Sequence, residues 1–107
     1  MSEYQCISPQ QAQQLLSNNA TLFDIRDSAS FENSPPSQAS NLNNDNIQQL
    51  LAGIDNNQPI LVLCYHGNSS KNAAQYISSL GFTAVSSIDG GFEAWQKLFP
   101  KDIEPAQ

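Results

Sequence analysis

The amino-acid sequence predicts a single α/β domain, a parallel sheet with helices on both faces. Apolar strand-like segments alternate along the chain with helix-like segments, which is the order that parallel sheets require. Residues 59–64 form a continuous apolar run, as expected of a strand buried on both faces. The length of 107 residues is that of one domain, and we expect that domain to span residues 1–107.

Apolar residues with polar boundaries indicate four strands, at 4–7, 21–25, 59–64 and 83–88. The first helix is expected directly after the first strand, with Ser8 as its N-cap and Pro9 in its first turn. Its buried face has the i, i+3, i+4 spacing and consists of Ala12, Leu15 and Leu16. A second helix is expected over 47–54, with Asp45 as its cap.

Two more helices are predicted in the C-terminal half. One follows the polar stretch 65–70, ends at Gly81 and carries Ala73, Ala74, Ile77 and Leu80. The other follows the turn 89–91, is stopped by Pro100 and places in the core Phe92, Trp95 and Phe99. Residues 28–46, which hold two prolines and an asparagine-rich stretch, are expected to form a loop-rich crossover.

Charge and composition exclude several functions. Four Lys and Arg residues against ten Asp and Glu residues give a net charge of −6, so we expect no basic surface for nucleic acid or an anionic membrane. No apolar run approaches the roughly 18–20 residues of a membrane span, and the first five residues lack the features of an export signal. We therefore expect a cytoplasmic protein. Cys6, Cys64 and a single histidine make neither a zinc site nor a disulfide framework, so no metal or cofactor is expected.

The chemistry is expected at the end of the most buried strand, because ligands of open parallel sheets bind beyond the carboxyl ends of the strands. Cys64 stands there, and a polar loop containing glycine, 65–70, leads from it into a helix. The N–H groups of such a loop, together with the helix N-terminus, form an anion-binding cradle. That cradle would stabilise the Cys64 thiolate, the nucleophilic form of cysteine, and Lys71 would add a positive charge.

More than one interpretation of these residues remains open. Cys64 could be a small apolar core residue, although its position on the loop favours a nucleophile. His66 is as readily a solvent-facing side chain as a base for Cys64. Arg26, which lies between two aspartates, is interpreted as a structural ion-pair partner, and Cys6 as a structural residue of the first strand.

Three segments carry a family resemblance: Asp24-Ile25-Arg26-Asp27, Cys64-Tyr65-His66-Gly67-Asn68-Ser69-Ser70-Lys71 with Ala73-Ala74 behind it, and Ser87-Ile88-Asp89-Gly90-Gly91-Phe92-Glu93-Ala94-Trp95. They resemble the single-domain rhodaneses, especially the small bacterial members encoded with the glycerol-3-phosphate genes. The chain departs from many rhodaneses at Ser69, where arginine is common outside the small subgroup, and at Ser34-Pro35, where Gly-His is common.

The resemblance implies a five-stranded sheet and a thiosulfate sulfurtransferase. Cys64 would take the outer sulfur of thiosulfate as a persulfide and release sulfite. It would then pass the sulfur to cyanide or to a thiol, for example a thioredoxin-like dithiol protein, in a ping-pong mechanism. Substrate binding would fall to the loop and the start of the following helix: Tyr65, His66, Gly67, Asn68, Ser69, Ser70 and Lys71.

Two alternatives compete with this function. A phosphatase or arsenate reductase on the same fold would need a longer loop and an arginine where Ser69 or Ser70 stands. A non-catalytic rhodanese module that binds a partner or senses redox state would usually lack the cysteine.

Overall fold

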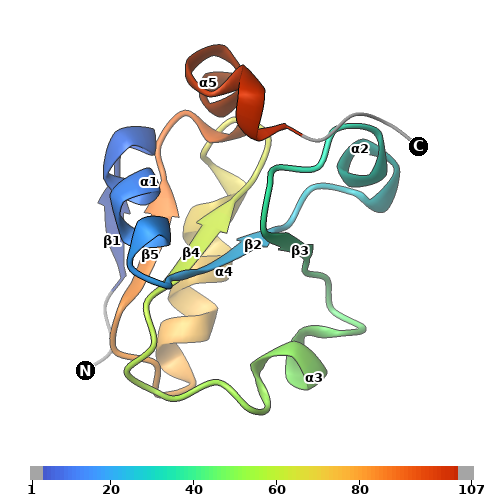
Figure 1. Ribbon diagram of the computed structural model, residues 1–107. Coiled ribbons are helices and arrows are strands. Elements are labelled where there is room, and N and C mark those ends of the chain that lie inside the picture. Colours follow the sequence, from blue (N-terminus) through green and yellow to red (C-terminus); the bar gives the residue numbers. More distant parts are fainter. Residues whose placement is uncertain (1–3, 104–107) are drawn as a thin grey trace.

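The computed structural model describes residues 4–103 and confirms the predicted fold class. Five parallel strands form one sheet in the order β1-β5-β4-β2-β3 (Figure 1). Their bounds are β1 Gln5–Ile7, β2 Thr21–Asp24, β3 Ala39–Asn41, β4 Ile60–Leu63 and β5 Val85–Ile88. All four residues of the central strand β4 are buried, as its continuous apolar run predicts.

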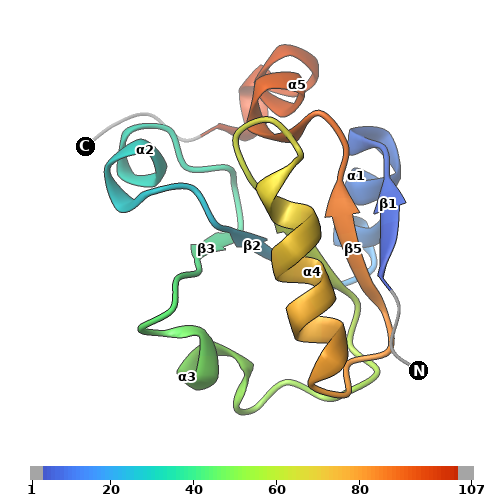
Figure 2. The same cartoon turned by 180° about the vertical axis from the view of Figure 1, so that it is seen from behind.

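Helices cover both faces of the sheet, as Figures 1 and 2 show from opposite sides. The helices are α1 Pro9–Ser17, α2 Ser28–Asn33, α3 Ile47–Leu51, α4 Ser69–Ser79 and α5 Gly91–Leu98, followed by a short 3₁₀ helix, η1, at Pro100–Asp102. Helices α3 and α4 pack on one face over a core that includes Phe23, Val62, Ala74 and Ile77. Helices α1 and α5 pack on the other face over a core that includes Leu22, Leu61, Ile88 and Trp95.

Helix capping follows the sequence at α1 and differs from it at α3. The Ser8 side chain accepts a hydrogen bond from the Gln11 N–H, and the Gln11 side chain accepts one from Ser8, which together form a capping box. The prediction of Asp45 as the cap of α3 is wrong, because the N-cap residue is Asn46. The Asn43 side chain accepts the N–H groups of both Asp45 and Asn46 and thereby forms the turn itself.

The prediction of a loop-rich crossover at 28–46 is wrong in part, since this segment contains α2 and β3. Helix α2 buries none of its residues, so it has no apolar stripe from which a helix could be predicted. Its start is set instead by Asp27, whose carboxylate accepts the Ser30 N–H. Strand β3 has only three residues, none of them buried, and pairs along one side with β2. A strand of this kind leaves almost no periodic signal.

Two apolar side chains of predicted elements lie at the surface. Cys6 is exposed, because β1 is an edge strand of the sheet. Leu80 is the C-cap residue of α4 and is 48% exposed. The helix does end as predicted, at Gly81 with a φ of 104°. In the described range, 4–103, no helix is both long and apolar enough to cross a membrane.

Candidate active site

Cys64 lies where the central strand enters the loop to α4. It directly follows Leu63, the last residue of β4, and the residue is buried, with 4% exposure. The loop that follows ends at α4, an eleven-residue helix. Cys64 is therefore held at the carboxyl end of the sheet, where ligands of open α/β folds bind.

The loop folds its hydrogen-bond donors around the sulfur. The Gly67 N–H donates to Cys64 Sγ at 3.0 Å, and the Ser70 hydroxyl lies 3.3 Å from the same atom. Ser70 is fully buried and is held from behind by Ser87 of β5, with 2.7 Å between the two hydroxyl oxygens. A chain of contacts therefore runs from β5 through the start of α4 to the thiol.

Burial and hydrogen bonding act in opposite directions on the thiol. Burial alone would raise the pKa of Cys64, because it disfavours the charged form. Hydrogen bonds from the Ser70 hydroxyl and from the N–H groups of Ser70, Gly67 and His66 outweigh burial, so the pKa lies below its ordinary value. The site thus favours the thiolate, the form that attacks sulfur.

The Gly90-Gly91 turn fixes the loop from the side opposite to α4. The Phe92 N–H donates to the Cys64 carbonyl at 2.7 Å, and the Glu93 N–H donates to the Tyr65 carbonyl at 3.1 Å. A methyl group at Gly91 would lie only 2.5 Å from that Cys64 oxygen and 2.6 Å from that of Tyr65. Glycine is therefore required here, because only a bare backbone lets the start of α5 bind the loop carbonyls.

The rim of the site consists of exposed side chains: Tyr65, His66, Asn68, Ser69 and Lys71. His66 Nδ1 lies 3.5 Å from a carboxylate oxygen of Glu93, and the His66 side chain is 61% exposed. The imidazole is therefore oriented toward the Glu93 carboxylate, while the backbone N–H of His66 helps to lower the pKa of the Cys64 thiol.

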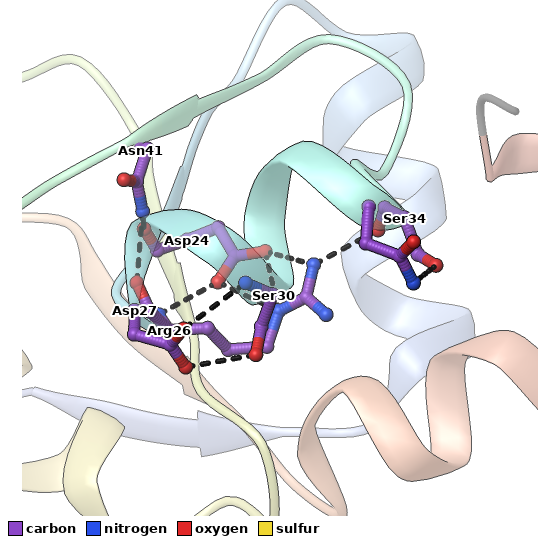
Figure 3. A network of polar contacts seen from close by, with 7 residues as sticks. Asp24, Arg26, Asp27, Ser30, Ser34 and Asn41 are labelled. Carbon is purple, nitrogen blue, oxygen red and sulfur yellow. Dashed lines mark hydrogen bonds and ion pairs between the residues drawn. The ribbon is translucent and has the colours of Figure 1, made fainter. Parts of the chain in front are cut away.

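Arg26 takes part in a buried ion pair, as predicted. Its guanidinium lies 2.8 Å from the Asp24 carboxylate, and both side chains are almost fully buried (Figure 3). It also lies over the ring of Phe92, 3.7 Å from the ring centre. The side-chain amide of Asn41 donates to the carbonyls of Asp24 and Arg26, both at 2.9 Å. This network ties the end of β2 to β3 and to α5.

Of the residues singled out in the sequence, the structure gathers only some around the sulfur. The N–H groups of His66, Gly67 and Ser70 converge on Cys64, whereas the side chains of the rim do not. Sequence reasoning missed Ser87, which supports Ser70. The only sign of this role in the sequence is that two serines, Ser86 and Ser87, stand inside an otherwise apolar strand. In residues 4–103, no three His, Cys, Asp or Glu side chains gather closely enough to hold a metal ion.

Comparison with known proteins identifies the family of this chain. The sequence model of the Rhodanese-like domain matches residues 8–98. The chain belongs to the rhodanese-like domain family. A curated relative is the thiosulfate sulfurtransferase GlpE of Ectopseudomonas mendocina (strain ymp). It is 47% identical over 102 residues, which cover 95% of this chain and 94% of the relative.

Solved rhodanese-like structures share the fold. A rhodanese-like domain protein from Staphylococcus aureus superposes with a TM-score of 0.78 at 18% identity, covering 96% of this chain and 99% of its own. Reduced Bacillus anthracis CoADR-RHD gives a TM-score of 0.78 at 19% identity, covering 94% of this chain. This chain spans only 18% of that longer one. At these identities the likeness concerns the fold alone.

The structure places Ser69 and Ser34, the two expected departures from the family resemblance, on different helices. Ser69 is the first residue of α4, and its side chain is exposed beside the loop. Ser34 is the C-cap residue of α2, and its carbonyl accepts a 2.9 Å hydrogen bond from Arg26 (Figure 3). The Ser34-Pro35 segment is thus joined to the buried ion pair rather than to the cysteine loop.

Proposed function

We propose that this chain is a thiosulfate sulfurtransferase in which Cys64 carries the sulfur. The supporting observation is the Cys64 thiol itself, buried at a strand end and bound by the Gly67 N–H and the Ser70 hydroxyl at 3.0 and 3.3 Å. The relative that is 47% identical is named for this activity. The active domain spans residues 1–107.

In the first half-reaction the Cys64 thiolate attacks the outer sulfur of thiosulfate. A new sulfur–sulfur bond forms to Cys64, and the bond between the two thiosulfate sulfurs breaks. Sulfite leaves with that electron pair. Thiosulfate and sulfite each carry two negative charges, so the enzyme keeps its one negative charge, now on the persulfide Cys64–S–S⁻. No metal, cofactor or oxidant is needed for this balance.

The loop stabilises the charge that the persulfide carries. Its terminal sulfur lies farther from β4 than the thiolate did, close to the loop N–H groups and the first turn of α4. Asn68, the N-cap residue, makes no side-chain cap hydrogen bond, so its side chain does not compete with an anion for the N–H groups of that turn. Lys71 adds a positive charge, and the rest of the binding loop is formed by Tyr65, His66, Gly67, Asn68, Ser69 and Ser70.

In the second half-reaction an acceptor removes the outer sulfur. Cyanide attacks it to give thiocyanate, and a thiolate attacks it to give an acceptor persulfide. In either case the electron pair of the breaking bond returns to Cys64 as thiolate. In the cell we expect a thiol acceptor, such as a thioredoxin-like dithiol protein, and the cytoplasm as the compartment, where thiols are kept reduced.

Steady-state kinetics test this mechanism. Thiocyanate is measured while thiosulfate is varied at several fixed cyanide concentrations. A ping-pong enzyme gives parallel double-reciprocal lines, because sulfite leaves before cyanide binds. Intersecting lines would contradict the covalent intermediate. Absence of turnover would favour the alternative, a non-catalytic rhodanese module that binds a partner or senses redox state.

A further inference from the structure

A groove of about 520 Å³ opens between α4 and the segments that follow β2 and β3. We propose that this groove, here called the acidic groove, docks a segment of the protein that accepts sulfur from Cys64. The docked segment carries an apolar side chain and a basic side chain next to its acceptor thiol. The inference rests on the proposed sulfurtransferase function and names the acceptor's chemistry.

The acidic groove begins beside the nucleophile. Ile25 lines it, and the Ile25 N–H donates at 2.8 Å to the carbonyl of Leu63, the residue before Cys64. Ala73 lines the opposite wall, one helical turn beyond Ser70, which contacts the sulfur. Figure 2 shows α4 and the segment joining β3 to α3 on either side of this region. A chain lying in the groove therefore passes within reach of a persulfide on Cys64.

The lining suits an amphipathic segment of a protein. Apolar side chains contribute to it from several elements: Ile25, Leu42, Ile47, Ala73 and Tyr76. Tyr76 is 49% exposed, although it is one of the larger apolar side chains of the molecule. A volume of about 520 Å³ lies in the range of specific binding clefts. Such a groove holds one or two side chains of a partner, and a small thiol would leave most of this surface uncovered.

The charge of the groove selects a cationic partner. Asp27 and Asp45 line it, and both are exposed. The only cationic lining residue is Arg26, whose charge is neutralised by Asp24 at 2.8 Å. The groove thus presents two uncompensated carboxylates, which attract a basic side chain and repel anions.

The anionic donor and the cationic acceptor approach from different sides of α4. Lys71 lies two residues before Ala73, which is about 200° around a helix. The positive charge that serves thiosulfate therefore faces away from the wall that Ala73 gives to the groove. Thiosulfate is not drawn into the groove, and the acceptor segment does not meet Lys71.

The walls of the groove are fixed before any partner binds. The Asp27 carboxylate accepts hydrogen bonds from both the N–H and the hydroxyl of Ser30. Asn46 donates through its side chain to the Asn41 carbonyl at 2.9 Å, which holds the segment that carries Asp45. A preformed groove binds more tightly because less ordering is needed on association.

The experiment uses the full chain, loaded with sulfur by thiosulfate and freed of excess donor. Three acetylated and amidated peptides each carry one cysteine and one leucine, and differ only in a lysine, glutamine or glutamate beside them. Sulfur transfer to each is followed by intact mass at low and at high salt. We expect transfer to be fastest to the lysine peptide, slower to the glutamine peptide and slowest to the glutamate peptide. The rate should fall roughly threefold or more at each step at low salt, and the differences should be smaller at high salt.

Matched variants assign the preference to the groove. Asp27→Asn with Asp45→Asn should abolish the order, because asparagine still caps α2 but carries no charge. Glu32→Gln with Asp55→Asn removes the same charge from exposed positions outside the groove and should retain the order. Tyr76→Ala should slow transfer to all three peptides several-fold.

Four results would overturn the proposal. If loaded protein shows no order among the peptides, or if the control pair loses the order equally, the groove does not select the acceptor. Cysteamine carries a positive charge and 2-mercaptoethanol does not. If cysteamine is preferred over 2-mercaptoethanol as strongly as the lysine peptide is preferred over the glutamine peptide, and Tyr76→Ala has no effect, the groove serves a small cationic thiol. Protein that takes up no sulfur at all overturns the proposed function, and the acceptor role of the groove with it.

Discussion

The reactivity of Cys64 is decided by a few hydrogen bonds that outweigh its burial. A cysteine at a buried strand end would ordinarily be an inert thiol. Here the Ser70 hydroxyl and three backbone N–H groups keep its pKa below the ordinary value. Because Ser87 holds Ser70 in place, the lowered pKa depends on Ser70 and Ser87 together and not on Cys64 alone.

The first prediction concerns the pH dependence of the thiol. Only the thiolate is alkylated, and its fraction grows as the pH rises through the pKa. A lowered pKa therefore moves the rise in alkylation rate of Cys64 to lower pH than in a short unstructured cysteine peptide. The measurement is made with Cys6→Ser protein, because Cys6 is exposed and would be alkylated as well.

Ser70→Ala should move that rise back to higher pH and slow alkylation at neutral pH several-fold. Ser69→Ala is the matched control, since this neighbouring serine is exposed. Equal profiles for the Ser70→Ala and wild-type proteins would contradict the role given to the Ser70 hydroxyl.

At the scale of elements, the active-site loop is held between α4 and α5. The start of α5 donates to the loop carbonyls, which leaves the loop N–H groups to face the sulfur. This arrangement depends on close backbone contact at Gly91.

Gly91→Ala should therefore destabilise the protein by about 2–4 kcal/mol, through both its positive φ and the clash with the loop. Gly53→Ala is the control, because a methyl group there would meet no atom within 4 Å. The free energies of unfolding are measured in urea. A Gly91→Ala protein as stable as Gly53→Ala would refute this account of the turn.

The buried ion pair at the end of β2 gives a further prediction. Arg26→Met leaves the buried Asp24 carboxylate without its partner and should cost about 3–5 kcal/mol. Lys97→Met removes an exposed charge and should change stability by no more than about 0.5 kcal/mol. Similar urea midpoints for the two variants would show that the pair is not structural.

The sequence predicts elements with strong apolar patterns and misses those without them. The apolar run at 59–64 predicts β4, and the Ser8 cap followed by Pro9 predicts the start of α1. Helix α2 has no buried residue, and β3 is a short strand with no buried residue, so neither leaves a periodic signal. The exposure of Cys6 could not be predicted, because strand order, which decides whether a strand lies at an edge, is not encoded locally.

For the candidate site, the position of Cys64 at a strand end and the loop that leads into a helix could be predicted, because strand end, glycine and helix start are consecutive in sequence. The support of Ser70 by Ser87 could not be predicted, because it requires the packing of α4 against β5. The role of Gly91 likewise becomes visible only once α5 is seen to bind the carbonyls of the loop.

At the scale of the whole molecule, an anionic substrate must approach a protein with a net charge of −6. Lys71 supplies a local positive charge at the start of α4. Lys71→Ala should raise the KM for thiosulfate about two- to fivefold at low salt with little change in kcat, and the difference should shrink as salt screens the charge. A KM that is unaffected at both low and high salt would contradict this role.

The central claim is that sulfur is carried on Cys64, and intact mass measured before and after thiosulfate tests it most directly. Wild-type and Cys6→Ser proteins should each gain one sulfur atom, which cyanide removes, while Cys64→Ser should gain none. Sulfur retained by Cys64→Ser, or no gain in any of the three proteins, would contradict the account.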